Sequence, residues 1–263
     1  MKPLSVIIIT KNEETNIQEC LESVSWADEI ILVDDDSNDR TVEIASRFKQ
    51  VRIFHKKMNE GFGPQKQYAL KQAHNDWIFS IDADERLSAE GRKEIVDKIL
   101  SDDCDGYYFR RKNFVFGKLI NDFQPKNLRL FKRTKGKFSN ARVHESVVLD
   151  GKIGTIEKPI IHYSRATRSI SDYITTLNLY TSLSAQDLYS RGKRINILTI
   201  PIYFLLHPLY LFFRLLLLKG HWKDGSTGVL LSFMRVLDGV INYIKLWEYQ
   251  IKNNRGGSNS KTN

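Results

Sequence analysis

Two carboxylates, Asp82 and Asp84, stand two residues apart directly after the mostly apolar run 77–81. At this spacing, on a chain that leaves a strand, they can flank one divalent cation. Mg²⁺ and Mn²⁺ prefer oxygen ligands and bridge readily to phosphate groups. Taken alone, an Asp-x-Asp pair is more often two solvated loop acids. The prediction of a metal and phosphate site therefore depends on what surrounds the pair.

A second acidic cluster, DDDSND at 34–39, follows another apolar run. A carboxylate just past a strand can accept the N3–H of a uracil or bond to a ribose hydroxyl. Asp34 and Asp36 also resemble the nucleophile motif of haloacid-dehalogenase-type phosphatases, which usually has Thr or Val where this chain has Asn38. A calcium loop is excluded, because its sixth position here is Asp instead of Gly and its twelfth is Ala instead of Glu.

The elements that must position these acids alternate along the first hundred residues. Buried strands are expected at 5–10, 29–36, 51–56 and 77–85, and helices at 11–24, 41–48, 65–73 and 90–100. Apolar strands separated by helices indicate an α/β fold with a mostly parallel sheet flanked by helices. Ligands bind beyond the carboxyl ends of such strands, so both acidic clusters are expected to share one site. Further strands, at 106–117, 128–133 and 146–151, predict a mixed or antiparallel extension.

The charge is concentrated at one end of the chain. The protein has 263 residues and a net charge of +9. Residues 1–190 carry a net charge of +1, whereas 191–263 carry 11 basic and 3 acidic side chains, a net charge of +8. This basic region is also the most apolar part, which argues against a nucleic-acid partner and for an anionic membrane surface. Two cysteines exclude a disulfide framework and a four-cysteine zinc site. The short apolar run at the start lacks the features of a secretory signal, so we expect a cytoplasmic location.

Two segments of this region suggest membrane contact. Residues 195–213 carry no formal charge, but Pro201, His207 and Pro208 interrupt them, which favours a re-entrant or interfacial helix over a simple span. A buried core hairpin is the alternative. Residues 226–247 predict an amphipathic helix that lies in the headgroup layer. We therefore expect a membrane-associating helical region at 191–252 and a disordered tail at 253–263.

Three motifs together resemble family 2 glycosyltransferases: SVIIITKNEE near the start, VDDDSNDRT after the second strand, and IDADE. The resemblance implies a GT-A fold over 1–190, with a nucleotide-sugar half at 1–100 and an acceptor half at 101–190. It also implies a nucleotide-diphospho-sugar donor, a Mg²⁺ or Mn²⁺ cofactor, and inversion at the anomeric carbon. RLFKR, VHES and DGSTGVLLSF resemble lipopolysaccharide core β-glucosyltransferases. That narrower resemblance implies UDP-glucose and a lipid-linked acceptor at the cytoplasmic face of a bacterial inner membrane.

The resemblance also assigns roles to individual residues. Thr10 and Glu13 would lie beside the nucleotide, and Asp34 and Asp35 would contact the uracil or ribose. The remaining donor residues are Lys66 near the diphosphate, Asp82 at the ribose or sugar, and Asp84 on the metal. A solvated helix lysine is the alternative for Lys66.

An inverting transfer needs a base that takes the proton of the acceptor hydroxyl. We favour Glu145, in the VHES segment, because the family places its catalytic acid in this acceptor-side region. Asp122 and Asp150 are the competing candidates, and an exposed strand pair formed with His144 is the alternative reading. Arg129 and Arg142 could hold a phosphate or form structural ion pairs. The sequence thus predicts a metal-dependent glycosyltransferase, with a phosphatase or a non-catalytic sugar-nucleotide-binding membrane protein as alternatives.

Overall fold

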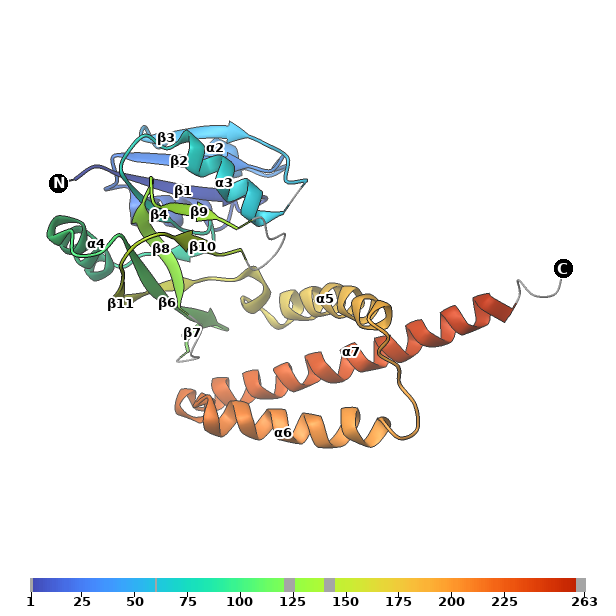
Figure 1. Ribbon diagram of the computed structural model, residues 1–263. Coiled ribbons are helices and arrows are strands. Elements are labelled where there is room, and N and C mark those ends of the chain that lie inside the picture. Colours follow the sequence, from blue (N-terminus) through green and yellow to red (C-terminus); the bar gives the residue numbers. More distant parts are fainter. Residues whose placement is uncertain (1, 60, 121–125, 140–144, 259–263) are drawn as a thin grey trace. The chain divides into compact units, whose positions relative to one another are not determined.

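The computed structural model describes residues 2–59, 61–120, 126–139 and 145–258, with the backbone alone for 254–258 (Figure 1). The chain divides into two compact units. The first unit comprises Met1–Asn113 and Phe123–Tyr163, and the second comprises Phe114–Asp122 and Ser164–Asn263. The functional division expected at residue 190 stays a prediction.

The first unit is built on a sheet whose first half is parallel. Its strands, in the order β3-β2-β1-β4, are β1 (Leu4–Thr10), β2 (Glu29–Asp34), β3 (Val51–His55) and β4 (Trp77–Ser80). Both faces are covered, because successive side chains of a strand point to opposite faces. On one face Ile8 and Leu32 pack with α1 (Ile17–Val24), α2 (Thr41–Ala45) and α4 (Ala89–Ser101). On the other, Ile7 and Ile31 pack with α3 (Phe62–Gln72).

A mixed extension continues this sheet beyond β4. The order is β4-β8-β6-β11-β5, and the strands are β5 (Glu85–Arg86), β6 (Gly106–Val115), β8 (Asn127–Lys132) and β11 (Ile153–His162). In this extension β6 and β11 pair in parallel, and the other neighbours are antiparallel. A separate hairpin pairs β9 (Gly136–Phe138) with β10 (Val147–Leu149), and β7 (Lys118–Leu119) pairs with the end of β6. The predicted mixed α/β, GT-A-like architecture is therefore confirmed, although strand β11 lacked a sequence signal.

The helix expected over 11–24 begins later, at Ile17. Asn12 adopts a left-handed backbone with φ 54°, and its N–H donates to the Ser37 hydroxyl (2.9 Å). The N–H of Glu13 likewise donates to Thr41 Oγ1 (2.7 Å). These two bonds tie the loop after β1 to the segment that follows β2. The helix therefore begins only beyond this loop.

The second unit is mainly helical. Its longer helices are α5 (Ile170–Ser190), α6 (His207–Phe213) and α7 (Ser226–Ser258). Short turns surround them: η1 (Arg165–Thr167), η2 (Ile202–Leu206), η3 (Arg214–Leu218) and η4 (His221–Asp224), of which η2 and η3 are π-helical. Helix α7 extends into the segment predicted as a tail, whose residues 259–263 lie outside the described part. Within the described ranges, we find no helix that combines the length and the apolar character needed to cross a membrane.

Candidate active site

Thr10 and Asp34 end the neighbouring strands β1 and β2 and are register partners. The N–H of Asp35 donates to the carbonyl oxygen of Thr10 (2.9 Å). The Asp34 carboxylate is 1% exposed and accepts from the Ser37 N–H (3.0 Å). The buried hydroxyl oxygen of Thr10 has no hydrogen-bond partner among the residues that the structure describes. The carboxyl end of the sheet thus presents a buried polar group that a ligand could satisfy.

Asp35 is held from two sides. Its Oδ2 lies 2.9 Å from Lys11 Nζ, and its Oδ1 accepts the N–H of Met58 (2.8 Å). Burial alone would raise the pKa of Asp35, but the Met58 N–H and the Lys11 ammonium outweigh it and lower that pKa below its usual value. Glu13 accepts from the Asn16 side chain through Oε2 (2.7 Å). Asp35 is therefore a fixed anion, and Glu13 helps to shape the turn that leads into α1.

A buried lysine joins two acids from distant parts of the chain. Lys66, on α3, is 4% exposed. Its Nζ lies 2.7 Å from Asp82 Oδ1 and 2.6 Å from Glu145 Oε1. Glu145 precedes β10, and Asp82 follows β4. The structure thus brings together the predicted diphosphate lysine, the first acid of the Asp-x-Asp pair and the predicted base.

The same Asp82 also contacts a buried arginine. Arg129, on β8, places NH2 2.9 Å from Asp82 Oδ2 and 2.9 Å from Glu85 Oε1. Glu85 is fully buried. Burial would raise the pKa of Asp82, but Arg129 and Lys66 hold that pKa well below its usual value. Opposite charges therefore alternate from Glu145 through Lys66, Asp82 and Arg129 to Glu85, and Asp82 is ionised throughout the physiological pH range.

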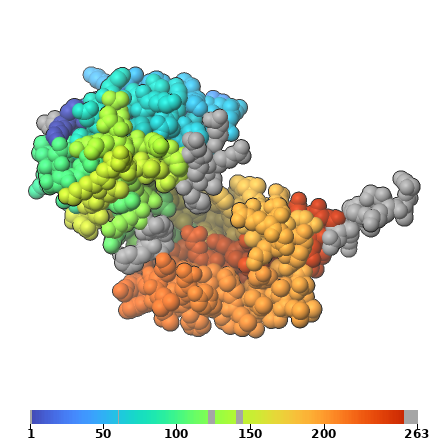
Figure 2. Space-filling model, in the orientation of Figure 1, coloured from blue at the N-terminus to red at the C-terminus, as the bar shows by residue number. Residues whose placement is uncertain are grey.

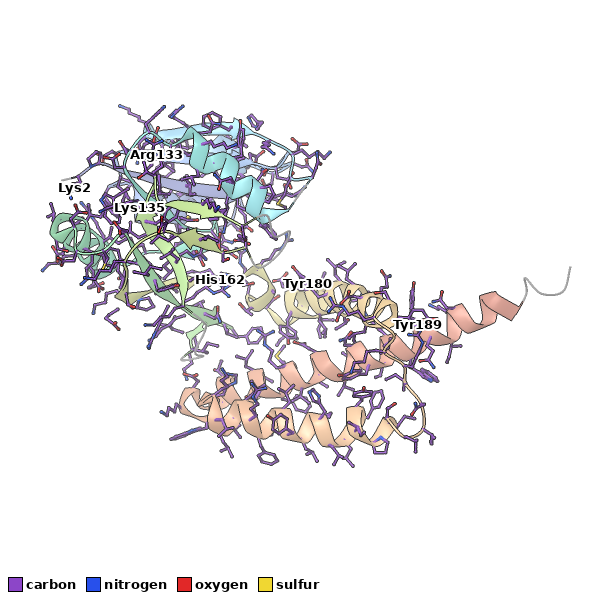
Figure 3. All side chains as sticks on the ribbon, viewed as in Figure 1. Lys2, Arg133, Lys135, His162, Tyr180 and Tyr189 are labelled. Carbon is purple, nitrogen blue, oxygen red and sulfur yellow. The ribbon has the colours of Figure 1, made fainter. Side chains whose placement is uncertain are left out.

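Asp84 has a different partner, which comes from β11. His162 Nε2 lies 3.0 Å from Asp84 Oδ2, and His162 Nδ1 lies 2.9 Å from the side-chain oxygen of Asn113. Figure 3 labels His162 in the first unit. When Nδ1 carries the ring proton, it can donate to the side-chain oxygen of Asn113, because an amide oxygen only accepts hydrogen bonds. In the neutral ring, Nε2 then directs its lone pair at the Asp84 carboxylate.

The two groups that meet here, a carboxylate oxygen and an imidazole nitrogen, are both able to ligate a divalent cation. Carboxylate oxygen suits Mg²⁺ and Mn²⁺, and a hydrogen bond to the other ring nitrogen commonly orients a metal-bound histidine. The described residues contain no group of three or more His, Cys, Asp or Glu side chains arranged to hold a metal ion. Asp84 and His162 therefore fit a partial site, which phosphate oxygens or water would have to complete.

The family model for glycosyl transferase family 2 matches residues 5–147, more than half of the chain. The chain belongs to glycosyltransferase family 2. A lipopolysaccharide core biosynthesis glycosyltransferase, LpsC of Rhizobium meliloti, is 32% identical over 254 residues, covering 91% of this chain and 88% of the relative. An uncharacterized glycosyltransferase of Rickettsia felis is 31% identical over 270 residues, covering 96% and 92%. A solved structure of TarS 1–349 from S. aureus, in complex with UDP, aligns with 89% of this chain and 90% of that chain, at 14% identity and a TM-score of 0.49.

Membership of the family confirms the resemblance and shows that the protein is a glycosyltransferase enzyme. The phosphatase and non-catalytic alternatives are not favoured. Of the candidate bases, Asp150 lies at the opposite end of β10 from Glu145, is exposed, and donates its N–H to the carbonyl oxygen of Lys135 (3.1 Å). Asp122, Arg142 and His144 lie outside the described residues.

Sequence reasoning gave no role to Glu85 or His162 and left the role of Arg129 open, and this glycosyltransferase brings all three to the site. Glu85 was seen as part of the acidic segment but was given no role. The sequence left open whether Arg129 contacts a phosphate or forms an ion pair, and the structure shows ion pairs with Asp82 and Glu85. His162 had no signal at all, because 78 residues separate it from Asp84. Only the position of His162 at the end of a strand could have drawn attention to it, and that strand was not predicted.

Proposed function

We propose that this enzyme transfers a sugar, with inversion, from a UDP-sugar to a lipid-linked saccharide of the bacterial envelope, such as the lipopolysaccharide core. UDP-glucose is the proposed donor. The observation that carries the proposal is the contact of Lys66 with both Asp82 and Glu145. Through Lys66, the proposed donor residue Asp82 lies close to the proposed base Glu145. A transfer between two substrates requires that the groups acting on each of them lie together.

The nucleotide would bind at the carboxyl ends of β1 and β2. Thr10 offers a buried hydroxyl without a protein partner within the described residues. Asp34 and Asp35 are buried carboxylates that can accept from a uracil N3–H or a ribose hydroxyl. Their local bonds fix them in place, so little conformational freedom would be lost on binding. Glu13 lies on the loop after β1, three residues beyond Thr10.

Glu145 would act as the base. In the proposed step the acceptor oxygen bonds to the anomeric carbon while the bond from that carbon to the diphosphate breaks. The acceptor proton passes to the Glu145 carboxylate, and UDP departs. Lys66 would hold Glu145 in position and present its ammonium to the diphosphate, while Asp82 would bond to the ribose or sugar.

Asp84 and His162 are the residues that would hold Mg²⁺ or Mn²⁺. The bound ion would neutralise negative charge on the departing diphosphate. The support for this assignment is the pairing of Asp84 Oδ2 with His162 Nε2 at 3.0 Å, with Asn113 behind the ring.

The acceptor and location are proposed from two observations. LpsC, a relative over most of this chain, is named for lipopolysaccharide core biosynthesis. The basic, apolar region 191–252 suits an anionic membrane surface, which would be the cytoplasmic face of the inner membrane.

A panel of UDP-sugars with Mn²⁺ and a lipid-linked saccharide tests the proposal. We expect UDP release and a lengthened saccharide with UDP-glucose, and no release when the acceptor is left out. Phosphate release from a phosphoester without any UDP-sugar would instead support phosphatase chemistry. UDP-sugar binding without turnover, for every donor and acceptor tried, would contradict an enzymatic role in this transfer.

A further inference from the structure

The segment from η2 to η3 carries an apolar surface on one side. Seven of its exposed apolar side chains recur at helical spacing and are each 48–59% exposed: Ile202, Leu205, Leu206, Leu209, Tyr210, Phe213 and Leu217. We refer to these seven residues as the apolar stripe. No Asp, Glu, Lys or Arg occurs from Ile195 to Phe213. Figure 2 shows this segment, in orange, at the surface.

The opposite side of the same segment already has partners. Tyr203 stacks on Tyr243 of α7, with ring centroids 4.2 Å apart and an interplanar angle of 17°. Phe204 packs in the same cluster as the fully buried Leu246. The helix is therefore folded against α7, and the apolar stripe is the side that remains.

Helices α5 and α7 share an apolar core, in which Leu177 clusters with Met234 and Ala185 with Leu246, and polar bonds lie beside it. The Tyr173 hydroxyl donates to Asp238 (2.6 Å). The other bonds run from Asn242 to Ser184 (3.1 Å) and from Lys245 to Asn178 Oδ1 (2.7 Å) and Ser182 (2.9 Å). In the predicted amphipathic helix 226–247, Asp238, Asn242 and Lys245 fall on the polar side. In the structure they bond to α5, so the polar side of α7 is used inside the unit.

Large apolar side chains point outward from these two helices. On α5, Tyr180 is 66% and Leu183 54% exposed, and on α7, Phe233 is 53% and Trp247 50% exposed; Figure 3 labels Tyr180. A helix in water normally turns its apolar side inward. Helices in lipid associate through close packing and interhelical hydrogen bonds, and they show apolar side chains to their surroundings. The outward side chains of the second unit have this distribution, and an apolar core also lies between its helices.

Cations lie at both ends of the apolar stripe in the sequence. Exposed Arg191, Lys193 and Arg194 precede it, exposed Arg214 lies before its last member, Leu217, and exposed Lys223 follows it. Lys and Arg near an apolar surface attract anionic lipid headgroups. A second protein copy would bring the same positive charge to the same surface. The charge therefore favours an anionic lipid over self-association.

We propose that the apolar stripe and the outward sides of α5 and α7 form one docking surface, which inserts into a single leaflet of an anionic bilayer. The flanking cations lie in its headgroup layer. This inference deepens the proposed function, since a lipid-linked acceptor resides at such a surface. It adds α5 to the membrane-associating region, which the sequence placed only after residue 190.

Flotation of the purified full-length protein with vesicles tests the docking surface. Vesicles of phosphatidylethanolamine and phosphatidylglycerol are compared with vesicles of phosphatidylcholine, at low salt and without detergent. The wild-type protein should float with the anionic vesicles and less with the neutral ones. Leu209→Glu should lower the vesicle partition coefficient about 10- to 100-fold, because a Leu that enters an apolar environment gains roughly that much.

Leu100→Glu is the matched control. Leu100 lies in the first unit and is 56% exposed, against 51% for Leu209, and its variant should float as the wild type does. Both variants should bind UDP as the wild type does, which shows that they fold and separates this test from that of the proposed transfer. Equal flotation of Leu209→Glu and wild type would overturn the docking surface. So would a wild-type dimer that stays with the aqueous fraction and that Leu209→Glu dissociates.

Discussion

The two units differ in how many of their large apolar side chains are exposed. Among the described residues, 27 large apolar side chains are exposed, of which 4 lie in the first unit and 23 in the second. In the first unit, helices cover both faces of the sheet, and Lys66, Asp82, Arg129 and Glu85 form buried ion pairs at the carboxyl ends of the strands. In the second unit, an apolar core and polar bonds join α5 to α7, while many other large apolar side chains face outward. Charge is thus concentrated inside the first unit, and apolar surface outside the second.

The largest effect should come from Asp84. We expect Asp84→Ala to lower kcat/KM for transfer by at least about 10³-fold, since losing the proposed metal ligand would remove several kcal/mol of transition-state stabilisation. Vesicle flotation should stay unchanged, because Asp84 belongs to the first unit. Steady-state kinetics in Mn²⁺ would measure the loss, and near wild-type rates would remove Asp84 from the site.

The next largest effect should come from Glu145→Gln. The change keeps the size of the side chain and removes the proton acceptor, so kcat should fall by roughly 10²–10⁴-fold. The affinity for UDP, measured by titration, should change little. Asp150→Asn is the control and should remain active, since Asp150 lies at the far end of β10. A dead Asp150→Asn beside an active Glu145→Gln would mean that the base is misassigned.

Arg129→Met addresses stability in the first unit. It leaves the fully buried Glu85 and the Asp82 carboxylate without their shared guanidinium. Removing one partner of a buried ion pair costs about 3–5 kcal/mol of the free energy of unfolding. Urea denaturation followed by tryptophan fluorescence would measure this cost. A loss below about 1 kcal/mol would show that these ion pairs are as weak as surface pairs.

The smallest effect should come from Asp238→Asn in the second unit. Burial raises the pKa of Asp238, despite the Tyr173 hydroxyl and Arg235 that oppose the shift. Because this pKa is higher in the folded than in the unfolded protein, Asp238 contributes stability at pH values below its unfolded-state pKa. That contribution is lost as the pH rises through its folded-state pKa. At neutral pH the uncharged Asn should therefore leave the free energy of unfolding unchanged, or raise it by up to about 1 kcal/mol. Thermal unfolding at pH 7 checks this, and a loss as large as that of Arg129→Met would erase the contrast between the units.

Much of the first unit could be predicted from local pattern. Runs such as SVIIIT and EIILVD indicate buried parallel strands, and the acids that follow must then lie at one end of the sheet. Asp34 and Asp82 were located in this way. The family motifs lie in the same segments, so the fold, the enzyme class and the proposed donor-binding residues could be predicted from residues that are near one another in the chain.

Tertiary structure decided the contacts that join distant segments. Lys66 and Glu145 are 79 residues apart, and Asp84 and His162 are 78 apart. No local pattern encodes such pairs, because they depend on where the segment before β10 and the end of β11 lie relative to α3 and to the chain after β4. The orientation of α7 was decided in the same way. Its spacing predicted two faces, but only packing could determine which of them contacts α5, since an amphipathic helix can present its polar side either to water or to polar groups of a neighbouring helix.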